Sequence, residues 1–113
     1  MSTLFLIGQN NSKGMESYVI EVTTFQFKST IDADNFWIED AKVEADYTSL
    51  QPGFISRESG YSPATNEVVV VVRWKTMDDA EASMQKFMGE TSVMTYADMI
   101  DASTMKMNRY SVN

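Results

Sequence analysis

Hydrophobic and polar positions change their spacing several times along the chain, and each change marks the edge of an expected element. Three stretches are rich in β-branched and aromatic side chains, which is typical of strands: residues 18–28 (YVIEVTTFQFK), 54–61 (FISRESGY) and 67–75 (EVVVVVRWK). Residues 103–112 (STMKMNRYSV) alternate between apolar and polar positions and predict a fourth strand. The turn at residues 62–66 predicts a hairpin between the second and third strands.

Helical spacing governs the segments between these strands. The first apolar stripe consists of Phe36, Val43, Tyr47 and Leu50, and it ends at the pair Pro52-Gly53. A second stripe consists of Met77, Ala80, Met84, Phe87 and Met88, and Gly89 is its natural stop. A short third stripe runs from Val93 to Ile100. The order β-α-β-β-α-(α)-β predicts an α+β, ferredoxin-like domain with a four-stranded antiparallel sheet and its helices on one face.

The third strand is apolar on both of its faces. Val68, Val70 and Trp74 alternate with Val69 and Val71, although a sheet covered by helices on one side should be polar on the other. A second copy of the chain is the expected cover, with an interface of roughly 1,600 Å² or more. The sequence therefore predicts a homodimer whose two sheets face each other. A sparsely covered central strand is the alternative.

Length and composition limit the classes of function. The 113 residues suit one domain, here residues 18–113 after an N-terminal extension at 1–17, and the net charge of -7 argues against nucleic acid or an anionic membrane as partners. The sequence has no Cys and no His, which excludes a thiolate nucleophile, a Ser-His relay, the usual zinc sites and an imidazole ligand for haem. We expect no metal and a cytoplasmic location.

Over most of its length the sequence resembles the dimeric α/β-barrel superfamily, and within it the antibiotic-biosynthesis-monooxygenase-like (ABM-like) group. The matching positions are Phe36, the turn Gln51-Pro52-Gly53-Phe54, the segment Trp74-Lys75-Thr76 followed by Ala80, and Tyr110. The resemblance covers about residues 18 to 112. It implies a homodimer with a pocket between sheet and helices in each subunit, and, as in some members, cofactor-free oxygenation of aromatic substrates.

This sequence differs from the ABM-like group at positions that decide which of the group's reactions it could catalyse. Its haem-degrading members use a His beyond the second helix, a Trp on that helix and an Asn on the first strand, whereas this chain has no His and carries Ser83 and Met84 on the second helix. Haem cleavage is disfavoured. Oxygenation of a small aromatic or enolisable substrate needs only a base, hydrogen-bond donors and a dry cavity, because the substrate anion supplies the electrons. A non-catalytic homodimer that binds a lipophilic molecule, such as an acyl chain or a polyketide-like ring, is the alternative function.

Asp40 is the first candidate for the base, because it shares the apolar helix face with Phe36 and Val43. An ion pair with a strand arginine is the competing interpretation, and the balance favours it. All three arginines, at positions 57, 73 and 109, lie on expected strands. Arg73 is proposed to anchor a substrate anion, against the alternative of cross-strand pairs with Glu21 or Glu58.

Aromatic and methionine side chains are the candidates for a pocket wall. Seven of the nine methionines fall between Met77 and Met107, where their flexible thioethers either line a lipophilic pocket or fill an irregular core. The predicted ligand-binding residues are Phe36, Trp37, Tyr61, Trp74, Met84, Met88 and Tyr96. For the aromatic members the hydrophobic core is the default interpretation and a stacked aromatic ligand the sharper one.

Overall fold

The structure is a computed structural model that describes residues 17–113. The strands are β2 (Tyr18–Phe27), β3 (Phe54–Ser62), β4 (Glu67–Trp74) and β5 (Ile100–Val112). The helices are α1 (Ala33–Asp46), α2 (Met77–Gly89) and the short α3 (Met94–Met99), with 3-10 turns η1 (Thr48–Leu50) and η2 (Thr91–Val93). Apart from its last residue, the N-terminal extension expected at 1–17 lies outside the described residues, so its boundary stays a prediction.

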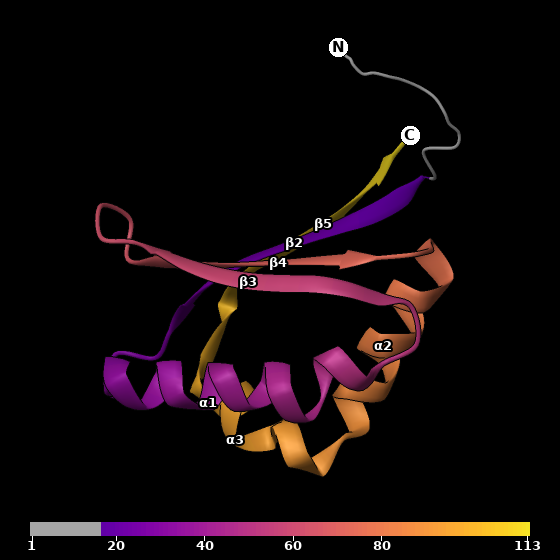
Figure 1. The fold of residues 1–113 in the computed structure, drawn as a ribbon. Helices are drawn as coiled ribbons and strands as arrows, with labels where there is room; N and C mark the ends of the chain where they lie inside the picture. The colour runs from indigo at the N-terminus through magenta and orange to yellow at the C-terminus, as the bar shows by residue number, and fades with distance from the viewer. Residues whose placement is uncertain (1–16) are drawn as a thin grey trace.

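The four strands form one antiparallel sheet in the order β3-β4-β2-β5. All three helices lie against the same face of this sheet, and the other face is open (Figure 1). The expected ferredoxin-like α+β architecture is confirmed. At one end, the C-terminal part of β5 runs beside the start of β2 beyond the helices, with Val112 opposite Tyr18 (Figure 1).

A side chain caps the start of helix α1 by accepting a hydrogen bond from one of its first backbone N–H groups. Asp32 is the N-cap, and its Oδ2 accepts a hydrogen bond from the Asn35 N–H at 3.2 Å. The helix ends at Asp46, so the expected continuation to Pro52-Gly53 is wrong. Because η1 turns the chain after Tyr47, Leu50 leaves the apolar stripe and is 71% exposed.

The turn before β3 packs against the start of α2, and a glycine permits this close contact. Gly53 has φ +81°, a backbone conformation that L residues rarely adopt, and a Cβ at this position would come within 2.1 Å of Asp79 Oδ2. Asp79 itself lies in the first turn of α2, where its N–H donates to the N-cap oxygen of Thr76 at 3.0 Å. The first turn of α2 therefore packs directly on the backbone of the Pro52-Gly53 turn.

The two faces of β4 have different surroundings. Val68, Val70, Val72 and Trp74 are buried beneath the helices. Val69 and Val71 on the open face are only partly buried, as are Ile20 and Val22 on the neighbouring strand β2. An apolar strip therefore remains on the side of the sheet that no helix covers. Within residues 17–113, no helix is both long and apolar enough to span a membrane.

Strand β5 carries a bulge in its pairing with β2. Thr24 pairs with Lys106 and Gln26 with Asp101, so residues 102–105 lie opposite Phe25 alone. The Gln26 N–H donates to Thr104 Oγ1 at 2.8 Å, and that hydroxyl donates to the Asp101 carbonyl at 2.7 Å. These two bonds fasten the bulged segment while the ladder continues on either side.

Candidate functional site

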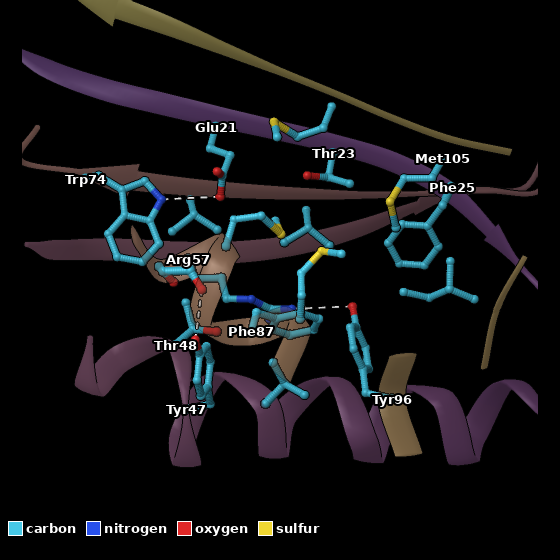
Figure 2. Close-up of a pocket in the computed structure, with 18 residues that line it drawn as sticks. Glu21, Thr23, Phe25, Tyr47, Thr48, Arg57, Trp74, Phe87, Tyr96 and Met105 are labelled. Atoms are coloured by element: carbon cyan, nitrogen blue, oxygen red, sulfur yellow. Dashed lines mark hydrogen bonds between the residues drawn. The ribbon is translucent and has the colours of Figure 1, made fainter. Parts of the chain in front are cut away.

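A cavity of about 250 Å³ lies between the sheet and the helices. Its wall is mostly apolar and is drawn in Figure 2. It is lined from the sheet by Glu21, Thr23, Phe25, Arg57, Val70, Val72, Trp74, Ile100, Met105 and Met107, and from the helices and turns by Val43, Tyr47, Thr48, Ser83, Met84, Phe87, Met88 and Tyr96. Met88 is 76% exposed, so the cavity reaches the protein surface at the end of α2.

A buried ion pair forms one side of the cavity. The Arg57 guanidinium donates from Nη2 to Asp40 Oδ1 at 2.8 Å and from Nη1 to Asp40 Oδ2 at 3.3 Å. The Tyr96 hydroxyl donates to the same Oδ1 at 2.9 Å, and it lies 3.5 Å from Arg57 Nη2 (Figure 2). The Arg57 side chain is 3% exposed and that of Asp40 is 9% exposed. A bidentate pair with this geometry compensates two charges that water cannot reach.

Burial and the neighbouring Asp40 shift the pKa values of Arg57 and Tyr96. Burial lowers the pKa of Arg57, but the hydrogen bonds and the charge of Asp40 raise it by more, so its pKa lies above the ordinary value. Burial and then the negative charge of Asp40 raise the pKa of Tyr96 well above that of a free tyrosine. The guanidinium is therefore a fixed cation and the phenol a fixed hydrogen-bond donor at any physiological pH.

A second buried charge lies on strand β2. Glu21 is 5% exposed, and its carboxylate accepts a hydrogen bond from Trp74 Nε1 at 3.3 Å and one from Arg109 Nε at 2.7 Å. Figure 2 shows the bond between Glu21 and Trp74. Arg109 comes from β5, where it is paired directly with Glu21 across the strands. Glu21 lines the cavity, whereas Arg109 supports it from outside the wall.

The register of the sheet places these charges in one row. Arg57 lies opposite Val72, Val72 opposite Glu21, and Glu21 opposite Arg109. Since neighbouring strands are about 4.8 Å apart, the backbones at Arg57 and Glu21 are separated by about 10 Å. The cavity therefore has a cation on one side, a carboxylate on the other and apolar walls between them.

Four of the predicted ligand-binding residues line this cavity, namely Trp74, Met84, Met88 and Tyr96. The other three are not part of its wall. Phe36 is fully buried, and the ring of Trp37 meets it edge-on with centroids 5.0 Å apart. Tyr61 packs on Phe27 and Trp37. Phe36 also packs on Phe25 and Tyr96, so these rings form an aromatic core behind the cavity wall, and the core interpretation applies to them.

The two predicted catalytic residues take different positions. Arg73 lies on the open face of the sheet, because it alternates with Val72 and Trp74, and its Nη1 is 3.4 Å from Glu58 Oε2. Its expected place in the pocket is therefore wrong. Asp40 is buried among the expected apolar neighbours, but it is absent from the cavity wall and is bound by Arg57. The competing ion-pair interpretation describes this geometry.

Sequence reasoning missed the roles of Glu21 and Arg57. The sequence predicts Glu21 only as a partner for an arginine, although it belongs to the same alternating set as Val19 and Phe25, which are buried. A carboxylate inside an apolar alternating set is the signal that was available. Arg57 carried no such signal, because its neighbours Ser56 and Glu58 are polar and only the strand register selects it over Arg73.

Comparison with known proteins places this architecture among solved structures. No family model matches the sequence, and no curated protein matches it. A protein from Bordetella bronchiseptica, provisionally named an antibiotic biosynthesis monooxygenase, aligns over 84% of this chain and 96% of its own, with TM-score 0.70 and 13% identity. SnoaB, a cofactor-independent oxygenase from Streptomyces nogalater, aligns over 86% and 92%, with TM-score 0.59 and 15% identity. A Nitrosomonas europaea protein with the same provisional name aligns over 84% and 86%, with TM-score 0.57 and 18% identity.

Fold and cavity together define a ferredoxin-like α+β domain with a small-molecule-sized cavity between its sheet and its helices. More particularly, this is the fold of the ABM-like proteins, as the resemblance in the sequence predicted. Because these three proteins share less than 20% sequence identity with this chain, the comparison concerns the fold alone.

Proposed function

We propose that the chain is an ABM-like, cofactor-independent monooxygenase that acts on a small aromatic or enolisable substrate bound in the cavity. The observation that carries the proposal is an apolar cavity whose wall holds both a buried cation, Arg57, and a buried carboxylate, Glu21. Such a site removes a substrate from water and presents groups that interact with a developing anion. The likeness of fold to SnoaB, a cofactor-independent oxygenase, supports the same reaction class.

The reaction balances without any added reductant. A CH₂ group beside an aromatic ring and O₂ become a carbonyl group and water, and the substrate supplies all the electrons. The protein has to bind the ring, hold the substrate oxygen and accept a proton. The aromatic and thioether groups of Trp74, Phe87 and Met84 offer the ring an apolar wall.

Non-catalytic binding of a lipophilic molecule is the second candidate. It is favoured by the methionines in the wall, Met84, Met88, Met105 and Met107, whose flexible side chains adapt to varied ligands. The position of Asp40 favours it as well, because Arg57 and Tyr96 already bind its two oxygens and it does not line the cavity.

Anthrone, a three-ring enolisable ketone, distinguishes the two candidates. A monooxygenase consumes one O₂ per anthrone above the buffer rate and forms anthraquinone that carries one oxygen atom from ¹⁸O₂. A binding module quenches the fluorescence of Trp74 in a Trp37→Phe variant, where it is the sole tryptophan, but consumes no O₂. If anthrone produces neither effect, both candidates fail for this class of ligand.

A pair of matched variants assigns either effect to the cavity. Met84→Trp adds bulk to the wall, and we expect it to weaken anthrone binding at least 10-fold. Met94→Trp makes the same exchange on an exposed side chain that does not line the cavity, and it should leave binding unchanged. Equal effects of the two substitutions would place the ligand elsewhere.

We also propose that two copies associate through the open face of the sheet. Partly exposed Ile20, Val22, Val69 and Val71 supply an apolar strip there, and an isologous contact between two such strips is self-complementary. The cytoplasmic location stays a prediction from the sequence.

A further inference from the structure

Glu21 is the one carboxylate among the described residues that line the cavity. It projects from β2 on the same face as Thr23 and Phe25, which line the cavity beside it. With 5% of the residue exposed, solvent has little access to its oxygens. A molecule in the cavity can therefore contact this carboxylate, which bulk water barely reaches.

The hydrogen bonds of Glu21 leave part of its accepting capacity unused. An ionised carboxylate has about four lone-pair sites on its two oxygens. Trp74 Nε1 takes one site on Oε1, at 3.3 Å, and Arg109 Nε takes one on Oε2, at 2.7 Å. These two bonds fix the orientation of the carboxylate from two different strands, and among residues 17–113 each oxygen keeps a free lone pair.

Asp40, unlike Glu21, is bound by protein groups on both oxygens and lies outside the cavity wall. Its Oδ1 accepts from both Arg57 and Tyr96, and its Oδ2 accepts from Arg57. It does not line the cavity, whereas the two residues that bind it do. A ligand in the cavity therefore meets the guanidinium and the phenol before it reaches Asp40, which makes Asp40 a positioning residue for Arg57.

We propose that Glu21 is the catalytic base of this site, an inference that rests on the proposed function. A Glu21 oxygen takes a proton from the CH₂ group of the substrate, and the C–H electron pair moves into the ring system, so that the negative charge falls on the ketone oxygen. Arg57 lies on the far side of Val72 from Glu21, and its guanidinium donates a hydrogen bond to the ketone oxygen. The hydrogen bonds of Arg57 within residues 17–113 use Nη1 and Nη2 but not Nε–H, which leaves a charged donor for this role.

Proton abstraction is measured apart from oxygenation. In D₂O under argon, the wild-type protein should exchange the CH₂ hydrogens of anthrone for deuterium faster than buffer does, as read by mass spectrometry. Glu21→Gln should lower this rate by about 10² to 10⁴-fold, the usual contribution of a general base, while binding measured by equilibrium dialysis changes less than about 3-fold. Glu58→Gln makes the same exchange on the open face and should keep the wild-type rate.

Two more variants guard against a simple loss of folding. Glu21→Asp keeps the charge but withdraws it by one methylene, so exchange should fall to an intermediate rate. Glu21→Gln combined with Arg109→Met removes the buried pair together, which avoids an unpaired Arg109. If either folded Glu21→Gln variant binds anthrone and exchanges it at the wild-type rate, Glu21 is not the base.

The two proposals fail separately. Exchange that depends on Glu21, without O₂ consumption in air, supports the base and removes the oxygenase. O₂ consumption with no deuterium exchange in the wild-type protein leaves the oxygenase and overturns the base.

Discussion

Removing the buried cation of the Arg57–Asp40 pair should destabilise the protein strongly. In Arg57→Met, the Asp40 carboxylate stays buried with a side chain 9% exposed, and within the described part of the chain only the Tyr96 hydroxyl still donates to it. Breaking a buried pair in this way typically costs about 3–5 kcal/mol. Since a domain of this size has a free energy of unfolding of about 5–15 kcal/mol, roughly a fifth or more of its stability should disappear.

The Arg73–Glu58 pair provides a matched comparison within the same sheet. Its atoms are 3.4 Å apart, but the two side chains are 33% and 71% exposed, so water screens the charges. Arg73→Met should therefore cost less than about 1 kcal/mol. Urea unfolding, followed by circular dichroism, gives the free energy of each variant, and the two arginine substitutions remove the same chemical group.

A double substitution separates the ion pair from its surroundings. Arg57→Met with Asp40→Leu removes both charges and leaves the Tyr96 hydroxyl without its acceptor, a loss of about 1–3 kcal/mol. The double variant should thus be more stable than Arg57→Met alone, by about 2 kcal/mol. An Arg57→Met variant that loses no more stability than Arg73→Met would refute the reasoning, as would a double variant that is less stable than Arg57→Met.

Three further perturbations test other parts of the structure. Because the pKa of Tyr96 is raised, the folded protein keeps this proton above about pH 10, where the unfolded chain loses it. The free energy of unfolding should then fall by about 1.4 kcal/mol per pH unit from this group, and urea titrations of Tyr96→Phe should show a shallower alkaline slope. Gly53→Ala should lower stability by about 1–3 kcal/mol, visible as a lower Tm, through its positive φ and the contact with Asp79; an unchanged Tm would contradict that packing. Light scattering should give twice the 12.8 kDa chain mass for the wild type and a monomer for Val71→Lys, and a wild-type monomer would leave the open face without its proposed cover.

The architecture was predictable because its signals are local. The alternating strand around Val68 to Trp74, the turn at Pro52-Gly53 and the stop at Gly89 each determine the conformation of neighbouring residues, and their order determines the topology. The end of α1 was misplaced because Leu50 continues the apolar spacing by sequence, whereas η1 turns the chain after Tyr47. A stripe of apolar residues does not record where backbone hydrogen bonds change partner.

The site was predictable only in part, because it depends on pairings between distant residues. Residue type predicts Trp74 and Tyr96 in the pocket, where they lie, but it is Arg57 and not the predicted Arg73 that faces the cavity. Arg57 faces the cavity because the register of β3 with β4 places it opposite Val72, whereas Arg73 is the next residue of β4 and points to the open face. No local sequence pattern reveals this register. Glu21 gains its place from Arg109, which is 88 positions away in the chain.

The bulge in β5 gives this fold a means of changing its pocket without changing its sheet. Residues 102–105 leave the ladder opposite Phe25, and Met105 from this segment lines the cavity. Because Thr104 and Asp101 fasten the segment and regular pairing resumes at Lys106, substitutions and small length changes there leave the rest of the register in place. A library randomised at residues 102, 103 and 105, with Thr104 kept, is therefore the economical route to new ligand preferences on an unchanged scaffold.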